Sequence, residues 1–500
     1  MQLSKSDYMM FLKHPAWLWL KKHDKDRLPP IDPGLQAMFD AGHAFEPYAE
    51  SLFAGGVTVG FDFNDRSRAY NTMPARTKAE LDMGVNVIFQ GRLEYGETTC
   101  IFDVLERIER NRFHLYEIKS ATKDKPEYVD DLAFQKLVLE GAGLVIELVS
   151  VIVVNNDYVR NGEVDAKLLT KVIDLTDKVN NRMESTREDV AKALEVLKSP
   201  TMPDLSPRHA HQQFLKDWLE VFLVLKLDTD PYSIYRLSGM KGDLIGELED
   251  QGIERLHDLP DSYQFGNGKH QRQLELVKHG QPIVQREQID QFLGQLQFPL
   301  YFFDYETMSS VVPAFDGTRP YQNVPVQYSL HILHEPNGEL EHREFLHTEH
   351  SNPGLDLVAQ LQQDIGTSGS IVVWYATFEK SRNDDLGEMF PEFADFMEKL
   401  NDRVVDLMIP FSEGWYEDYR FLGSASIKKV LPILVPELSY KSLAIQEGQT
   451  ASRLWVEAVI ERKHEANKQQ LFADMLAYCK LDTLAMVKIW EFLSNPARPR

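Results

Sequence analysis

The stretch TTCIFDVLERIERNRFHLYEIKS, residues 98–120, decides how the first part of the chain folds. Its two halves, Thr98 to Ile108 and Arg112 to Lys119, are rich in β-branched and aromatic residues, which favours β-strands. The polar pair Arg110-Asn111 separates them. We therefore predict an antiparallel hairpin in which the residue numbers of facing positions add up to about 220.

Two acids and a lysine meet on one face of this predicted hairpin. Asp103 falls opposite Glu117, and Lys119 follows Glu117 by two positions on the same face. Buried like charges are unfavourable unless a cation neutralises them, and carboxylate oxygens are the ligands that Mg²⁺ or Mn²⁺ prefers. Lys119 can then hold either the attacking water or the scissile phosphate. The plainer interpretation is a solvated hairpin with an ordinary ion pair, but both acids interrupt apolar runs.

These motifs resemble the RecB-like branch of the PD-(D/E)XK nucleases, which includes the nuclease associated with CRISPR spacer acquisition. The resemblance spans residues 1–200 and implies a restriction-endonuclease-like α/β core. It implies catalytic roles for Asp103, for the E-x-K motif Glu117-Ile118-Lys119, and for Gln135 at the end of YVDDLAFQ, residues 128–135.

The same resemblance extends upstream to GHAFE, residues 42–46. This segment resembles a helical motif that supplies another metal ligand, which implies Glu46, with His43 as the alternative. Many relatives also hold an iron-sulfur cluster through cysteines. This chain has two cysteines, Cys100 and Cys479, so no iron-sulfur cluster is expected.

A second set of acids lies in the last two-fifths of the chain. Asp304 and Glu306 end the apolar run Leu300 to Phe303 and, two positions apart, leave one face of the predicted strand. Tyr478 and Asp482 are four apart in a helical run and share one helix face. Glu379 follows another apolar run that ends at Tyr375.

In this order the motifs resemble the DEDD exonucleases of the RNase H-like superfamily, in the subgroup with tyrosine. The resemblance covers about residues 298–495 and implies an RNase H-like domain over 298–500. It also implies that Asp304, Glu306, Glu379 and Asp482 hold two divalent ions while Tyr478 orients water. The middle ligand is usually aspartate, so the alternatives to Glu379 remain open: Asp384, Asp385 and Asp406.

A basic pair in the same region is a candidate for substrate binding. Lys428 and Lys429 follow GSAS, residues 423–426, where a helix can begin and meet a phosphate. A solvated helix face is the alternative.

The chain as a whole has 500 residues, 43% hydrophobic and 26% charged, which indicates a globular protein of several domains. We predict an α/β multidomain protein with a helical middle segment, 201–297, that weakly resembles helix-hairpin-helix modules. Before it we expect a helix over about 128–140, a strand over 145–154 and a long polar helix over about 165–198. In the last region, strands at 300–303, 327–333, 340–346, 371–375 and 403–407 alternate with helices. Asn337-Gly338 predicts a hairpin turn between the strands 327–333 and 340–346.

The sparse cysteines exclude a disulfide framework and favour a reducing cytoplasm. No apolar run is long enough for a membrane helix. The net charge of −23 argues against a polyanionic partner at long range, although bound divalent ions would reverse the local field of their ligands. We therefore predict that the protein binds nucleic acid weakly and that this binding depends on bound divalent ions.

Together these features predict a metal-dependent nuclease with two centres that uses Mg²⁺ or Mn²⁺. The order of its modules resembles an uncharacterised bacterial nuclease family, and DNA is favoured over RNA by the resemblance of the first module. The alternatives are a nucleic-acid-binding scaffold in which the C-terminal or both centres are inactive, and a metal-dependent phosphatase acting on a nucleotide.

Overall fold

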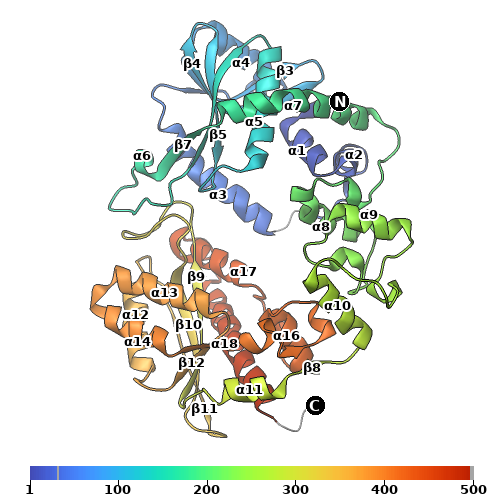
Figure 1. The fold of residues 1–500 in the computed structure, drawn as a ribbon. Coiled ribbons are helices and arrows are strands. Elements are labelled where there is room, and N and C mark those ends of the chain that lie inside the picture. The colour runs from blue at the N-terminus through green and yellow to red at the C-terminus, as the bar shows by residue number, and fades with distance from the viewer. Residues whose placement is uncertain (31–32, 63, 496–500) are drawn as a thin grey trace. The chain divides into compact units, whose positions relative to one another are not determined.

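The computed structural model describes residues 1–30, 33–62 and 64–495 (Figure 1). The chain forms two compact units, of which unit 1 contains Met1–Tyr158 and Gly162–Asp258 and unit 2 contains Val159–Asn161 and Leu259–Arg500. Both combine a β-sheet with helices, so the protein is a mixed α/β multidomain fold, as predicted. The segment 201–297 is divided between the two units at Asp258. Within the described residues, no helix combines the length and apolar character that crossing a membrane requires.

Unit 1 is built on a seven-stranded mixed sheet. The strands run in the order β2-β3-β4-β5-β6-β7, and β1 pairs with β4. Their bounds are β1 Leu3–Ser4, β2 Val57–Thr58, β3 Val87–Tyr95, β4 Thr98–Glu109, β5 Arg112–Lys119, β6 Val145–Val154 and β7 Thr170–Asp174. The helices are α1 Lys5–Lys13, α2 Pro15–His23, α3 Pro33–Glu50, α4 Met73–Asp82, α5 Pro126–Gly141, α6 Ala166–Leu169, α7 Thr176–Lys198, α8 Leu215–Leu225 and α9 Gly242–Asp250.

The hairpin of β4 and β5 has the register predicted from its sequence. Leu105 pairs with Leu115 and Val104 with Tyr116, so the numbers of facing residues add up to 220 as far as Arg107. A register shift between Arg107 and Glu109 then precedes the turn at Arg110. Helix α5 packs on the sheet and against α7 (Figure 1), and the apolar residues of these elements form one core.

One predicted helix of unit 1 is wrong in its first part. The segment expected to be helical from about residue 165 instead contains the short helix α6 and the strand β7, and only α7 is a long helix. Strand β7 pairs antiparallel with β6 and carries the β-branched residues Thr170, Val172 and Ile173. Pairing with a neighbouring strand, together with this composition, outweighs the polar character that suggested a helix.

Unit 2 contains a five-stranded sheet in the order β11-β10-β9-β12-β13 and a two-stranded sheet of β8 and β14. The strands are β8 Ile283–Val284, β9 Leu300–Met308, β10 Val324–Leu333, β11 Leu340–Leu346, β12 Ser370–Val373, β13 Val404–Asp406 and β14 Tyr416–Glu417. The helices are α10 Gly268–His279, α11 Arg286–Leu293, α12 Gly354–Asp364, α13 Ala376–Met389, α14 Ala394–Asp402, α15 Ile409–Ser412, α16 Ile427–Leu434, α17 Gly448–Trp455 and α18 Lys468–Ser494.

The central strand β9 is covered on both faces. Phe302 and Met308 belong to a core that includes residues of α16, α17 and α18, whereas Phe303 and Tyr305 belong to a second core with residues of α12 and α14. Side chains alternate between the faces of a strand, so the even-numbered residues of β9 face α18. The predicted hairpin around Asn337 is also confirmed, because Leu333 pairs with Leu340 and Asn337 has a φ of 61°.

Candidate functional sites in the two units

The first cluster of acids lies where β4 and β5 pair in unit 1. The backbone N–H of Ile118 donates to Asp103 Oδ2 over 2.7 Å, which holds this carboxylate beside the strand that carries Glu117. Glu117 is only 2% exposed. The structure therefore brings Asp103 and Glu117 together, as the hairpin register predicted.

The carboxylate of Glu117 accepts three hydrogen bonds. Lys119 Nζ donates to its Oε1 over 2.8 Å, Lys5 Nζ donates to the same oxygen over 2.7 Å, and Gln135 Nε2 donates to Oε2 over 2.7 Å. Asp131 joins this network, because its carboxylate accepts from Lys119 over 2.9 Å and from Gln135 over 2.9 Å. Four predicted site residues thus share one cluster with two residues that the sequence analysis did not select.

The charges of this cluster shift its protonation equilibria in opposite directions. Burial and the neighbouring Glu117 raise the pKa of Asp103 to about 7. Burial alone would also raise the pKa of Glu117, but Lys119 and Lys5 outweigh it and hold this pKa below its usual range. The attraction of Asp131 and Glu117 similarly overcomes burial and keeps the pKa of Lys119 well above its usual value. Lys119 therefore stays a hydrogen-bond donor at neutral pH.

Glu46 lies in α3 and has other neighbours. Its carboxylate accepts from Gln90 Nε2, and His43 Nδ1 lies 3.7 Å from Glu46 Oε2. The contacts described for Glu46 include none with Asp103 or Glu117. The structure therefore brings Glu46 and its alternative His43 together with each other, but not into direct contact with the cluster.

Two members of the first cluster were missed by the sequence analysis. Asp131 lies four positions before Gln135 in α5, so helical spacing could have placed it on the same face. Lys5 begins α1, more than a hundred positions before Glu117, and no local pattern signals their contact.

The second cluster forms around β9 in unit 2. Asp304 and Glu306 point toward α18, and ligand atoms of Asp304, Glu306 and Cys479 lie within 4.8 Å of one another. The Cys479 thiol lies 3.8 Å from Asp304 Oδ2. The alternation of β9 and the packing of α18 against it thus bring the predicted D-x-E pair onto the helix that carries Tyr478 and Asp482.

Asp482 is held by a tyrosine from a different element. The hydroxyl of Tyr440 donates to Asp482 Oδ1 over 2.5 Å, and both residues are buried. The ring of Tyr478 lies 6.1 Å from that of Tyr440. Tyr440 was missed by the sequence analysis, because it lies in a short 3-10 turn with no periodicity that would link it to α18.

Lys428 lies close to these two tyrosines. Its Nζ is 5.7 Å from the ring centre of Tyr440 and 5.6 Å from that of Tyr478, and it donates to the Gln446 carbonyl over 3.0 Å. Lys428 is exposed in the first turn of α16, as is Lys429. The structure thus places Lys428 beside the second cluster, whereas no described contact links Lys429 to it.

Glu379 belongs to the same cluster. It lies in the first turn of α13, which follows β12, and β12 is parallel to β9. It is 2% exposed, and its Oε2 is buried without a hydrogen-bond partner in the described part of the chain. Burial, and then the nearby charges of Asp304 and Glu306, raise the pKa of Glu379 well above its usual value.

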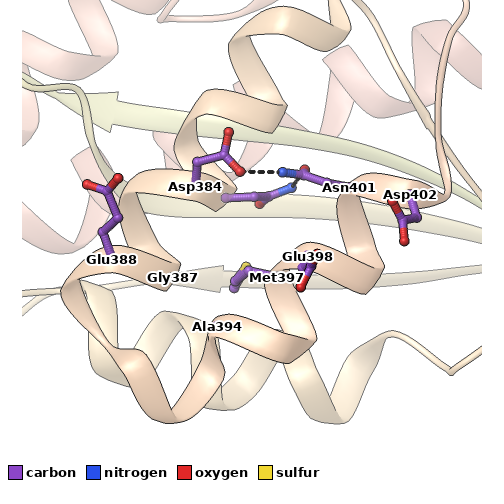
Figure 2. Close-up of a pocket in the computed structure, with 9 residues that line it drawn as sticks. Asp384, Gly387, Glu388, Ala394, Met397, Glu398, Asn401 and Asp402 are labelled. Carbon is purple, nitrogen blue, oxygen red and sulfur yellow. Dashed lines mark hydrogen bonds between the residues drawn. The ribbon is translucent and has the colours of Figure 1, made fainter.

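The three alternatives to Glu379 have other partners. Asp384 accepts from Asn401 over 2.8 Å and lines a cavity of about 480 Å³ between α13 and α14, which Figure 2 shows. Asp385 pairs with Arg382 at 2.9 Å. Asp406 accepts from the backbone N–H groups that begin α13, at 2.9 Å for Ala376. Of the four candidates, only Glu379 therefore lies with Asp304 and Glu306.

Burial and mutual repulsion disfavour the charged form of this second cluster. Burial is the main cause for each acid; it raises the pKa values of Asp304 and Glu306 well above their usual range and that of Asp482 to about 6. In the described part of the chain, none of Asp304, Glu306, Glu379 and Asp482 forms an ion pair with a lysine or arginine. The charge of Lys428 opposes this effect only weakly at Asp304, Glu306 and Asp482. Grouped carboxylates without an ion-paired lysine or arginine are suited to hold divalent metal ions.

Comparisons with known proteins give relatives without a described activity. A family model described as a domain of unknown function (DUF2779) matches residues 301–426. The chain is similar to the uncharacterized protein MG366 of Mycoplasma genitalium, at 24% identity over 214 residues, covering 39% of this chain and 32% of that protein. It is also similar to the uncharacterized protein UU173 of Ureaplasma parvum serovar 3, at 23% identity, covering 44% of this chain and 35% of that protein. No solved structure shows a significant match.

The matched regions include only part of the second cluster. The chain spans about a third of the length of the curated relatives that it matches. The family match covers β9 and α13, and therefore Asp304, Glu306 and Glu379. It ends before Tyr440 and before α18, which carries Asp482.

Proposed function

We propose that this protein is a metal-dependent nuclease that hydrolyses phosphodiester bonds, with DNA as the favoured substrate. Unit 1 would supply a RecB-like PD-(D/E)XK centre, and unit 2 an RNase H-like centre of the DEDD type with tyrosine. The assignment rests on the motifs of the sequence and on the side chains that the fold groups around them.

One observation carries the proposal. Glu379 Oε2 is buried without a donor, within a group of acids that no lysine or arginine of the described chain pairs with. An unpaired buried carboxylate costs several kcal/mol, so such a group needs either protons or cations. The carboxylate oxygens of this group are ligands that fit Mg²⁺ or Mn²⁺. Asp304, Glu306, Glu379 and Asp482 would hold these ions in unit 2, and Asp103 and Glu117 would hold one in unit 1.

A bound divalent ion would lower the pKa of a coordinated water and stabilise charge on a phosphoryl oxygen. The chain itself contributes orientation. Lys119 uses two of its three N–H donors on Glu117 and Asp131, which leaves one for a water molecule or a phosphate oxygen. Burial raises the pKa of Tyr478, so its hydroxyl keeps its proton and can donate to a water in unit 2. Lys428, exposed beside it, is suited to bind a phosphate of the substrate.

The experiment is a cleavage assay on labelled single- and double-stranded DNA and RNA in Mg²⁺ or Mn²⁺. It compares wild type with Lys119→Ala, Asp304→Ala and the double variant. The matched controls are Lys192→Ala, an exposed lysine of α7, and Asp384→Ala, which changes an acid of unit 2 outside the cluster. We expect each single variant to lose one activity, the double variant to lose both, and the controls to keep both.

Two outcomes would count against the proposal. If wild type and the double variant behave alike, the protein is not a nuclease through these centres. If Lys119→Ala removes all cleavage, the second cluster belongs to a binding scaffold. Cleavage of mononucleotides regardless of polymer length would instead support a phosphatase.

A further inference from the structure

Backbone pairing and a helix start place Lys5 at the first cluster. It is the first residue of α1, and Ser4 caps this helix by accepting from the Asp7 N–H. Directly before it, β1 pairs with the start of β4, with Leu3 opposite Thr98 and Ser4 opposite Thr99. Because β4 also carries Asp103, this pairing fixes where the Lys5 side chain begins relative to the acids.

The ammonium group of Lys5 mirrors that of Lys119. Both donate to Glu117 Oε1, over 2.7 Å and 2.8 Å, and both form ion pairs with Asp131, at 3.8 Å and 2.9 Å. Both side chains are also 25% exposed. The cluster therefore holds two fixed positive charges against the three carboxylates of Asp103, Glu117 and Asp131.

This charge balance differs from that of the second cluster. There, four carboxylates have no ion pair with a lysine or arginine within the described residues, so they can balance two divalent ions. In the first cluster, two lysines face three carboxylates, so at most one net negative charge remains. In addition, a carboxylate has about four acceptor positions, and Glu117 already uses three of them.

We infer that Lys5 is a positioning residue that supplies the second positive charge of the first cluster, so that this cluster binds one divalent ion instead of two. The inference rests on the proposed function of unit 1 and goes beyond it, because it assigns both a metal stoichiometry and the residue that sets it. Replacing Lys5 by a neutral side chain removes a charge, and methionine also frees an acceptor of Glu117, which opens the cluster to a second ion.

The test counts bound Mn²⁺ by electron paramagnetic resonance of the free ion, in the full chain. An Asp304→Asn/Asp482→Asn background weakens the second cluster, so that the count reports on unit 1. Lys5→Met and Lys5→Gln are compared in this background with the charge-preserving Lys5→Arg and with Lys192→Met on α7, while circular dichroism follows folding. We expect one Mn²⁺ per chain in the background, in Lys5→Arg and in Lys192→Met, and two in Lys5→Met and Lys5→Gln.

The outcomes separate this inference from the proposed function. Two ions in the background protein, or one ion in both folded neutral variants, would overturn the role of Lys5 and leave the metal centre standing. No bound Mn²⁺ in the background protein would overturn the metal centre of unit 1 itself. If Lys5→Met does not fold, the Mn²⁺ count of Lys5→Gln tests the inference. The amide of this variant can still donate to Glu117 and so support folding. If neither neutral variant folds, Lys5 is a structural residue and the inference is wrong.

Discussion

The buried acids of unit 2 predict that removing one of them stabilises the metal-free protein. Asp482 is the best choice, because burial raises its pKa from 3.8 to about 6 and the Tyr440 hydroxyl donates to its Oδ1. In Asp482→Asn, the amide oxygen can still accept from Tyr440. The variant therefore removes a charge while it preserves the shape and the hydrogen bond of the side chain.

The size and sign of the effect follow from the pKa difference. A carboxylate whose folded-state pKa is raised loses stability as pH rises from 3.8, its unfolded value, through about 6, its folded value. At about pH 8 the full cost applies, which at ~1.4 kcal/mol per pKa unit amounts to at most about 3 kcal/mol. Near pH 4.5 only about 1 kcal/mol of it remains. For a unit of this size, the gain near pH 8 corresponds to a rise of about 6–12 °C in melting temperature.

Thermal denaturation in EDTA at the two pH values measures this effect, with Asp384→Asn as the control for a carboxylate outside the cluster. We expect Asp482→Asn to melt higher than wild type near pH 8, with a smaller difference near pH 4.5, and Asp384→Asn to follow wild type. Added Mg²⁺ or Mn²⁺ should reverse the order, because wild type then gains a ligand that the variant lacks. A variant less stable than wild type near pH 8 in EDTA would refute the reasoning.

Three further variants test individual contacts of unit 2. Tyr440→Phe removes one of the hydrogen-bond donors to Asp482, the other being Tyr478. Because a hydrogen bond to a charged group contributes about 1.5–3 kcal/mol, we expect Mn²⁺ binding to weaken about tenfold or more, and an unchanged affinity would contradict this. Gly448→Ala places a methyl group 3.4 Å from Glu306 Oε2, so we expect an unchanged melting temperature but weaker Mn²⁺ binding, both measured on one preparation. Asp406→Ala removes the acceptor for the N–H groups that begin α13 and should cost about 0.5–2 kcal/mol in denaturant unfolding, with cleavage retained; loss of cleavage in the folded variant would make it a ligand.

Local patterns predicted those parts of the fold that depend on neighbouring residues. The turn at Arg110-Asn111 fixed the register of its hairpin, and with it the meeting of Asp103 and Glu117, because a short turn leaves few alternative pairings. The Asn337 hairpin was predictable for the same reason. Segment 170–174 was not, because its strand depends on pairing with β6, which no local pattern reveals.

The site residues, too, were predictable where their spacing along one strand or helix is informative, and not where the contact joins distant parts of the sequence. Asp304 and Glu306 were found because two positions along a strand share a face, and Asp482 with Tyr478 because four positions along a helix do. Lys5 and Tyr440 were missed because each reaches its partner from an element far away in the sequence, across 112 positions for Lys5. Charge alone could not select them, since lysines and tyrosines occur throughout the chain.

Buried negative charge is balanced by lysines in the first cluster but not in the second. For this reason the net charge of −23 alone does not determine whether a polyanion can bind near either cluster. In the first cluster, Lys5 and Lys119 already balance most of the charge, so its geometry does not depend on a bound ion. In the second cluster, no lysine or arginine of the described residues forms an ion pair with the acids, so its charged form depends on bound cations. Because salt screens exposed charges beyond about 10 Å at 0.1 M, a phosphate close to either cluster responds mainly to the local balance of carboxylates, lysines and metal ions. Acidic residues elsewhere on the chain would then slow the approach of the proposed nucleic-acid substrate without excluding it from the two clusters.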